Sequence, residues 1–196
     1  MQKLVNRIIQ YCVNEQLVHA EDIPWFRYGL EKRIATIVVG IPFLIISFFV
    51  APPTRAISFF ATYFFVRRYI GGYHAKTVQG CIVFSLLIEL VFLGGLPYLL
   101  NARGYLVILI ISLAAVLALA PHNHPNMHFS SDEIDLCRKK GHQRVCLASL
   151  VAAIAYWAGK KEIANGCTIG ITMAATLLCL GYIQNWRNVP YEKQHN

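Results

Sequence analysis

The stretch IVFSLLIELVFLGGLPYLL, residues 82–100, is almost wholly apolar and contains one charged side chain, Glu89. A helix needs about 20 apolar residues to cross a bilayer, with a range of about 17 to 25. This stretch is therefore long enough to span a membrane. Five more apolar runs occur, and those at 56–66 and 145–158 reach span length only with flanking residues, so about six transmembrane helices are expected. The other three runs are 34–50, 105–120 and 163–183.

The whole chain has the composition of a membrane protein. Its 196 residues are 56% hydrophobic and 14% charged, and its mean hydropathy is +0.47, whereas soluble domains carry about a quarter charged residues. We expect an all-α fold, a polytopic helical bundle that forms a single integral membrane domain over residues 1–196. Nothing before the first apolar run resembles a cleaved signal peptide.

Residues 1–33 mix polar and apolar side chains and precede the expected bundle at 34–183. In residues 1–17 the apolar side chains fall on one helical stripe. This pattern predicts an amphipathic helix that lies on the membrane or packs under the bundle, with an ordinary soluble amphipathic helix as the alternative. The stripe comprises Leu4, Ile8, Ile9, Cys12, Val13 and Leu17.

The basic residues indicate an orientation. With six spans, 14 of the 18 Lys and Arg residues fall on the side that holds 1–33, 67–81, 121–144 and the tail 184–196. The positive-inside rule then places both termini in the cytoplasm. The net charge of +8 is explained by this topology, because no separate basic domain is present, and no nucleic-acid partner is expected.

The polar break GGYHAKTVQGC, residues 71–81, places a His and a Cys on the expected cytoplasmic side. A free thiol has a pKa of about 8.5, so Cys81 needs a base such as His74 to become a nucleophile. On a straight helix the two residues would share a face but lie roughly 10 Å apart along the axis. A catalytic dyad therefore requires a break in the helix between them.

The same stretch supplies such a break. Gly71-Gly72 permits an unusual tight turn, and Thr77 is suited to a helix N-cap. Cys81 would then lie at the start of the next helix, where the helix dipole favours a thiolate, and Gly80 would leave room beside the sulfur for a peptide. On spacing alone, His74 as a polar loop residue and Cys81 as a small apolar one remain the alternative.

The segment RRYIGGYHAKTVQGC, residues 67–81, resembles the signature of the accessory gene regulator B family. The shared features are two basic residues, a Gly-x-His-Ala core and a Cys seven residues after the His. The layout is also similar: a polar amphipathic start, a hydrophobic bundle, and a cytoplasmic loop opened by Ala120-Pro121 and followed by HNHPN.

The resemblance implies an integral membrane cysteine endopeptidase of the bacterial cell membrane, at home in Firmicutes. Cys81 would be the nucleophile and His74 the general base, and no cofactor is implied. Family members cleave the C-terminal tail from an AgrD-like precursor peptide, then pass the acyl group to an internal thiol. The product is a cyclic thiolactone, or a lactone where Ser replaces that thiol, used in quorum sensing. A homodimer is expected, again by resemblance.

Further residues are candidates for the oxyanion and for substrate binding. Backbone N–H groups near Gly80–Cys81 are expected to stabilise the oxyanion, with Lys76 as a second candidate. Gly71 and Gly72 complete this set.

Basic side chains form a second set of candidates. Arg67 and Arg68 suit anchoring to anionic lipid or contact with the precursor. Lys139 and Lys140 could meet an acidic tail of the precursor; a solvated helix that enters the next span is the alternative.

Two other classes of protein compete with the peptidase. A small transporter would spread polar residues through several spans, but Glu89 is the only charged residue deep in a span. We interpret Glu89 as a buried, protonated or hydrogen-bonded structural residue. A metal-binding membrane protein would use the His-rich 121–144 loop, but the spacing matches no standard zinc site, so no metal site is expected. The residues concerned are His122, His124, His128, Cys137, His142 and Cys146.

Overall fold

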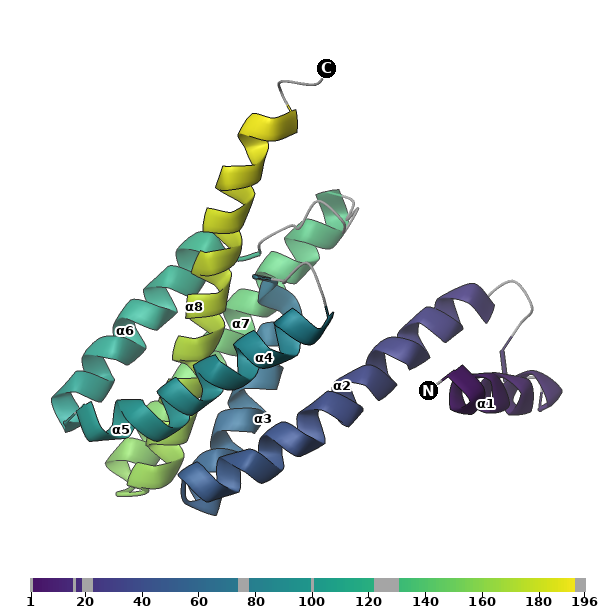
Figure 1. The fold of residues 1–196 in the computed structure, drawn as a ribbon. Helices are drawn as coiled ribbons and strands as arrows, with labels where there is room; N and C mark the ends of the chain where they lie inside the picture. The colour runs from purple at the N-terminus through teal and green to yellow at the C-terminus, as the bar shows by residue number, and fades with distance from the viewer. Residues whose placement is uncertain are drawn as a thin grey trace. The chain divides into compact units, whose positions relative to one another are not determined.

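The computed structural model describes residues 2–15, 17–18, 23–73, 78–99, 101–121 and 131–192. Within these ranges the regular structure is entirely helical and contains no strand (Figure 1), which confirms the expected all-α class. The helices are α1 (Gln2–Asn14), α2 (Ile23–Val50), α3 (Pro53–Ile70), α4 (Val78–Glu89), α5 (Leu96–Leu99), α6 (Ala102–Leu119), α7 (Ser131–Trp157) and α8 (Lys161–Glu192). A π-helical segment, η2 (Leu90–Gly95), joins α4 to α5.

The chain divides into two compact units, residues 1–45 and 46–196. In the first unit, Arg27 of α2 donates a hydrogen bond of 2.7 Å to the side chain of Asn6 in α1. Helix α1 is shorter than the predicted stripe, because the N–H of Leu17 bonds the carbonyl of Cys12 five residues back and so closes the last turn. Leu17 lies outside the helix and is 70% exposed.

The second unit is built around α8, which contacts α3, α6 and α7 (Figure 1). Glycines allow α8 and α3 to approach closely. A Cβ added at Gly170 would lie 2.8 Å from the carbonyl oxygen of Phe59, and one at Gly166 would lie 2.4 Å from that of Arg55. Small residues of this kind are how helices in membrane proteins bring their backbones together.

The described residues of all six predicted apolar runs lie within helical segments, except Ala120 and Ala158, which each follow the last residue of a helix. Those segments are α2, α3, the continuous segment α4–η2–α5, α6, α7 and α8. By length and composition, one stretch among the described residues could cross a membrane, residues 161–184 of α8. Shorter apolar stretches occupy Gly40–Val50, Val83–Tyr98 and Arg103–Leu119. The count of six spans therefore remains a prediction.

The 121–144 segment is largely helical. Helix α7 begins at Ser131 and continues without a break through the predicted span at 145–158 as far as Trp157. Describing the whole segment as a loop was therefore wrong for residues 131–144, which form a helix that leads into that predicted span. Residues 122–130 lie outside the described ranges.

Candidate active site

The candidate site begins where α3 ends at two glycines with unusual backbone angles. Gly71 has φ 69° and Gly72 has φ 128°. Only glycine adopts such angles at little cost, so the predicted unusual turn at Gly71-Gly72 is confirmed. Residues 71–73 are not helical, and α4 begins at Val78. Cys81 is therefore the fourth residue of a helix that starts after His74.

Arg67, in the last turn of α3, closes this turn. One nitrogen of its guanidinium donates to the carbonyl of Gly71, and the other donates to the carbonyl of Tyr73 at 3.1 Å. A guanidinium presents several donors in a fixed fork, which suits two neighbouring acceptors. The side chain is part-buried and acts on the backbone before His74, a role that the sequence pattern did not suggest.

Residues 72–73, which follow α3, pack against helix α8. The N–H of Tyr73 donates a hydrogen bond of 2.7 Å to the carbonyl of Leu177. Beside it, a Cβ on Gly181 would lie 2.8 Å from both the carbonyl carbon of Gly72 and the nitrogen of Tyr73. The backbone of residues 72–73 thus lies directly against α8.

The ring of Tyr73 connects the loop to α4. Its centroid is 4.8 Å from that of Phe84, with 50° between the ring planes. Both rings pack against a buried apolar cluster that includes Leu177 and Met173 of α8. Phe84 follows Cys81 by three residues, so it lies about one helical turn further along α4. Tyr73 therefore contacts the helix of Cys81 and directly precedes His74 in the sequence.

The predicted dyad itself is only partly described. His74 and Lys76 lie outside the described residues, as does Thr77, the predicted N-cap. For Cys81 the structure gives the backbone position in α4. Gly80, the other candidate near the oxyanion, lies in α4 and is half-buried. The His74–Cys81 dyad and its oxyanion donors remain predictions.

Basic side chains from α3 and α7 gather around Tyr69. The guanidinium of Arg144 lies 4.3 Å from the centroid of the Tyr69 ring and donates to the carbonyl of Phe65 at 2.9 Å. Lys140 and Arg68 lie 5.6 and 5.7 Å from the same ring centroid. We call Arg68, Tyr69, Lys140 and Arg144 the basic cluster.

The basic cluster depends on close packing of α7 against the end of α3. A Cβ on Gly141 would lie 3.3 Å from the side chain of Ile70, and Gly141 itself is buried. Arg68 and Lys140 are exposed at the surface, as is neighbouring Lys139. The structure thus brings Arg68 and Lys140 together, although they are far apart in the sequence.

Glu89 is buried at the end of α4, 1% exposed. It accepts a hydrogen bond from the hydroxyl of Ser47 in α2, which agrees with the predicted hydrogen-bonded structural role. The π-helical segment begins at the next residue. Such segments are inserted locally into α-helices and often mark functional regions.

No group of three or more His, Cys, Asp or Glu side chains within the described ranges is arranged to hold a metal ion. Cys137, His142 and Cys146 all lie on α7. The predicted histidines of the preceding loop, His122, His124 and His128, lie outside those ranges.

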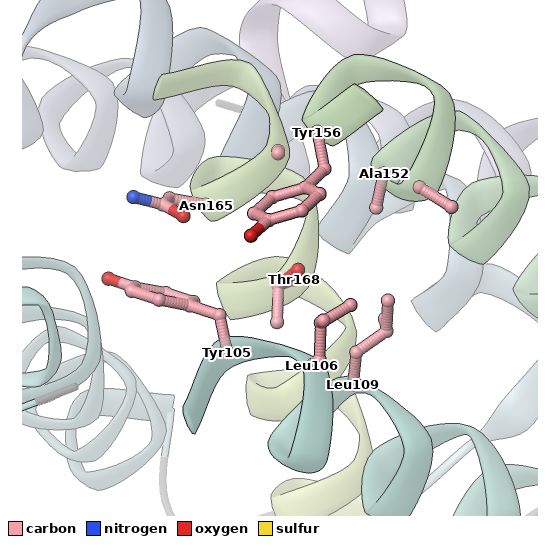
Figure 2. Close-up of a pocket in the computed structure, with 9 residues that line it drawn as sticks. Tyr105, Leu106, Leu109, Ala152, Tyr156, Asn165 and Thr168 are labelled. Carbon is pink, nitrogen blue, oxygen red and sulfur yellow. The ribbon is translucent and has the colours of Figure 1, made fainter. Parts of the chain in front are cut away.

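A separate small pocket, open to the surface, lies between α6, α7 and α8. Figure 2 shows the rings of Tyr105 and Tyr156 on opposite sides of it, with Asn165 and Thr168 on α8 between them. Its lining contains no His or Cys. Thr168 is nine residues before Leu177, roughly 14 Å along α8, so this pocket is not the candidate site.

The sequence did not reveal residues that are distant in the chain but contact the candidate site. Leu177 and Gly181 lie in an apolar run whose pattern indicated only a span. Arg144 was seen as one of several charges, without its contact to Tyr69. A signal was present in α8, because glycines at 166, 170 and 181 are costly in a helix and so point to close packing.

These features define a protein that is all-helical over its described residues and in which the backbone just before the His-and-Cys motif lies against the last helix. The sequence matches the model of the family described as Accessory gene regulator B over residues 3–179, and the chain belongs to that family. Membership implies a part in the processing of quorum-sensing peptides, an association with a membrane, and a precursor peptide as the partner. The comparisons found no matching curated protein and no matching solved structure.

Proposed function

We propose that this protein is a membrane-embedded cysteine endopeptidase that removes the C-terminal tail of an AgrD-like precursor peptide and closes the remaining segment into a ring. The observation that supports this most directly is the double role of Tyr73. It precedes His74 in the chain, and its ring contacts Phe84 on the helix that carries Cys81. Tyr73 thus connects the segment that leads into His74 with the helix that carries Cys81.

The reaction proceeds in two steps. His74 takes the proton of the Cys81 thiol, and the thiolate attacks the peptide carbonyl at the cleavage site. Backbone N–H groups near Gly80 stabilise the oxyanion. The tetrahedral intermediate collapses, the C–N bond breaks, and the tail leaves as an amine that takes the proton from His74. The precursor is now bound to Cys81 as a thioester.

Ring closure is a thioester exchange. His74 accepts the proton of a thiol within the bound peptide, that thiol attacks the acyl carbon, and Cys81 leaves as a thiolate that recovers the proton. The exchange replaces one thioester by another and is close to balanced, whereas hydrolysis is strongly downhill. A site at the membrane interface that excludes water favours closure, and holding both ends of the segment makes the attack effectively intramolecular.

The arrangement of the basic cluster supports a role in binding the tail. Arg68 and Lys140 both lie against the ring of Tyr69, and Lys139 is exposed next to Lys140. Arg67, which precedes Arg68, connects this surface to the turn before His74 through its hydrogen bonds to the carbonyls of residues 71 and 73. We assign these basic side chains to an acidic tail of the precursor, through electrostatic complementarity.

We further propose a multi-pass arrangement of about six spans in the bacterial cell membrane, with both termini and the active site in the cytoplasm. The charge asymmetry of the sequence supports this orientation. A homodimer completes the proposal. Because the precursor is made on ribosomes, a cytoplasmic active site meets it without transport.

The decisive experiment uses the full chain in liposomes with a synthetic precursor from the same genome. Wild type, Cys81→Ser and His74→Ala are compared for release of the tail, and mass spectrometry follows an acyl adduct on the Cys81 peptide. Wild type is expected to release the tail and form the adduct, and both variants are expected to lose release. Undiminished cleavage by both variants would end the proposal.

A further inference from the structure

Gly72, after α3, and Gly181, in α8, lie where residues 72–73 pack against α8. A Cβ on Gly181 would lie 2.8 Å from backbone atoms of residues 72 and 73, and a Cβ on Gly72 would lie 2.8 Å from the carbonyl oxygen of Leu177. Contacts this short with backbone cannot be relieved by moving a flexible side chain. A side chain at Gly181 must therefore push the loop away from α8.

The loop at this point is held on three sides through Tyr73. Its N–H bonds Leu177 of α8 at 2.7 Å, its carbonyl accepts from Arg67 of α3 at 3.1 Å, and its ring packs on Phe84 of α4. His74 is the next residue in the sequence after Tyr73, which makes these three contacts. Any shift of Tyr73 therefore changes where the chain enters His74 relative to the helix of Cys81.

We propose that Gly181 is a positioning residue for peptide cleavage. By leaving α8 without a side chain there, it allows residues 72–73 to lie on the helix and sets the point from which His74 reaches Cys81. The inference rests on the proposed function, because it assumes the His74–Cys81 dyad. A misplacement of about 1 Å can cost a reaction about 100-fold, so a single methyl group at Gly181 is expected to matter.

The matched variants are Gly181→Ala and Gly170→Ala. Both add one methyl group to α8 at a position where it would lie 2.8 Å from backbone atoms. Gly170 faces Phe59 and Tyr63 of α3, and it lies eleven residues, roughly 16 Å, from Gly181 along the helix. Gly170→Ala therefore reports the cost of crowding α8 without touching the loop.

The readout is the pH dependence of Cys81 alkylation by iodoacetamide, followed by mass spectrometry of the Cys81 peptide, in the full chain reconstituted in liposomes. In wild type the apparent pKa of Cys81 is expected below about 8.5, and His74→Ala is expected to raise it. Gly181→Ala is expected to raise it in the same direction and to slow tail cleavage by about 10- to 100-fold. Gly170→Ala is expected to lower thermal stability but to keep the wild-type pH profile.

A second pair of variants changes Tyr73 itself and adds no atoms to α8, in case Gly181→Ala does not fold. Tyr73→Ala removes the ring contact with Phe84 and is expected to raise the pKa of Cys81, whereas Tyr73→Phe keeps the ring and is expected to match wild type. A wild-type profile in folded Gly181→Ala, or in Tyr73→Ala, would overturn the inference. So would an equal shift in Gly170→Ala.

The controls separate this inference from the function on which it rests. If His74→Ala leaves the alkylation profile of wild type unchanged, the dyad itself fails. If His74→Ala shifts the profile and Gly181→Ala does not, the dyad stands and only the positioning role of Gly181 fails.

Discussion

The backbone N–H of Tyr73 donates a hydrogen bond of 2.7 Å to the carbonyl of Leu177 in the last helix of the chain. The carbonyl of a residue within an α-helix already accepts from the N–H four residues on, and its second lone pair is free for another donor. The helix thus binds the loop without losing its own hydrogen bond. The first prediction concerns Gly72, whose backbone approaches the same carbonyl oxygen.

Replacing Gly72 is expected to be far more harmful than replacing Gly159. Both glycines have positive φ, 128° and 72°, but a Cβ on Gly72 would lie 2.8 Å from the backbone carbonyl oxygen of Leu177, whereas one on Gly159 would meet no atom within 4 Å. Gly159→Ala should cost about 1 to 2 kcal/mol for its backbone angle alone. Gly72→Ala should cost more and abolish most tail cleavage. Thermal melts with cleavage assays test this, and equal losses in the two variants would contradict it.

Arg67→Lys is expected to reduce cleavage by about tenfold or more, although the charge is kept. A lysine ammonium is a point donor at the end of a flexible stem and cannot reproduce the fork that reaches two carbonyls. Arg138→Lys is the matched control, because Arg138 is exposed and makes a loose ion pair with Asp135, at 3.7 Å. Cleavage rates of the two variants at one precursor concentration decide the matter. The explanation fails if Arg67→Lys behaves as Arg138→Lys does.

Reversing charge in the basic cluster is expected to weaken binding of the precursor rather than the chemical step. Exposed ion pairs contribute about 0.2 to 1 kcal/mol each, so Lys140→Glu should raise KM by about two- to tenfold once repulsion is included, with kcat little changed. The effect should shrink as salt is added. Lys161→Glu, which makes the same charge change at the start of α8, is the control.

The assignment to the tail also predicts a compensating change. A precursor whose tail acids are replaced by lysines should bind Lys140→Glu better than it binds wild type. If KM of Lys140→Glu is unchanged for both precursors, the basic cluster does not contact the tail.

Glu89→Gln is expected to retain cleavage, whereas Glu89→Ala should destabilise the fold by about 1 to 3 kcal/mol. The carboxyl is buried and accepts a hydrogen bond from Ser47, and the glutamine amide offers a carbonyl acceptor of similar size. Glu89→Ala leaves the Ser47 hydroxyl without that acceptor. Thermal melts and tail release measure the two effects. Loss of cleavage in a stable Glu89→Gln would instead indicate that the carboxylate itself takes part in the reaction.

The sequence predicted the helical class and nearly all positions of the apolar segments, because hydrophobic runs and polar breaks are local features of the chain. It also predicted the turn at Gly71-Gly72, since two adjacent glycines in front of a polar segment have few other uses. It placed the basic residues on one expected side but could not show that Arg68 and Lys140 share the ring of Tyr69.

What the sequence could not provide is tertiary. The end of α1 at Asn14 depends on a wide hydrogen-bonded turn at Leu17, which has no marked sequence signature. The packing of residues 72–73 against Leu177 and Gly181 joins segments about a hundred residues apart. An apolar run with glycines does not show which segment it packs against. The sequence offered a helix entering the next span as one alternative for the charged stretch before residue 145, but it did not locate the start of α7 at Ser131.

The contact between Tyr73 and Leu177 also bears on how relatives are recognised in genomes. A reading frame that ends before residue 177 would still encode all residues of the stretch 67–81 and would match a search for the short signature. Its product would nevertheless lack the carbonyl that binds Tyr73 within that stretch. Truncated copies of this kind are therefore expected to be inert remnants, and the last helix should be required before a reading frame is counted as a working copy.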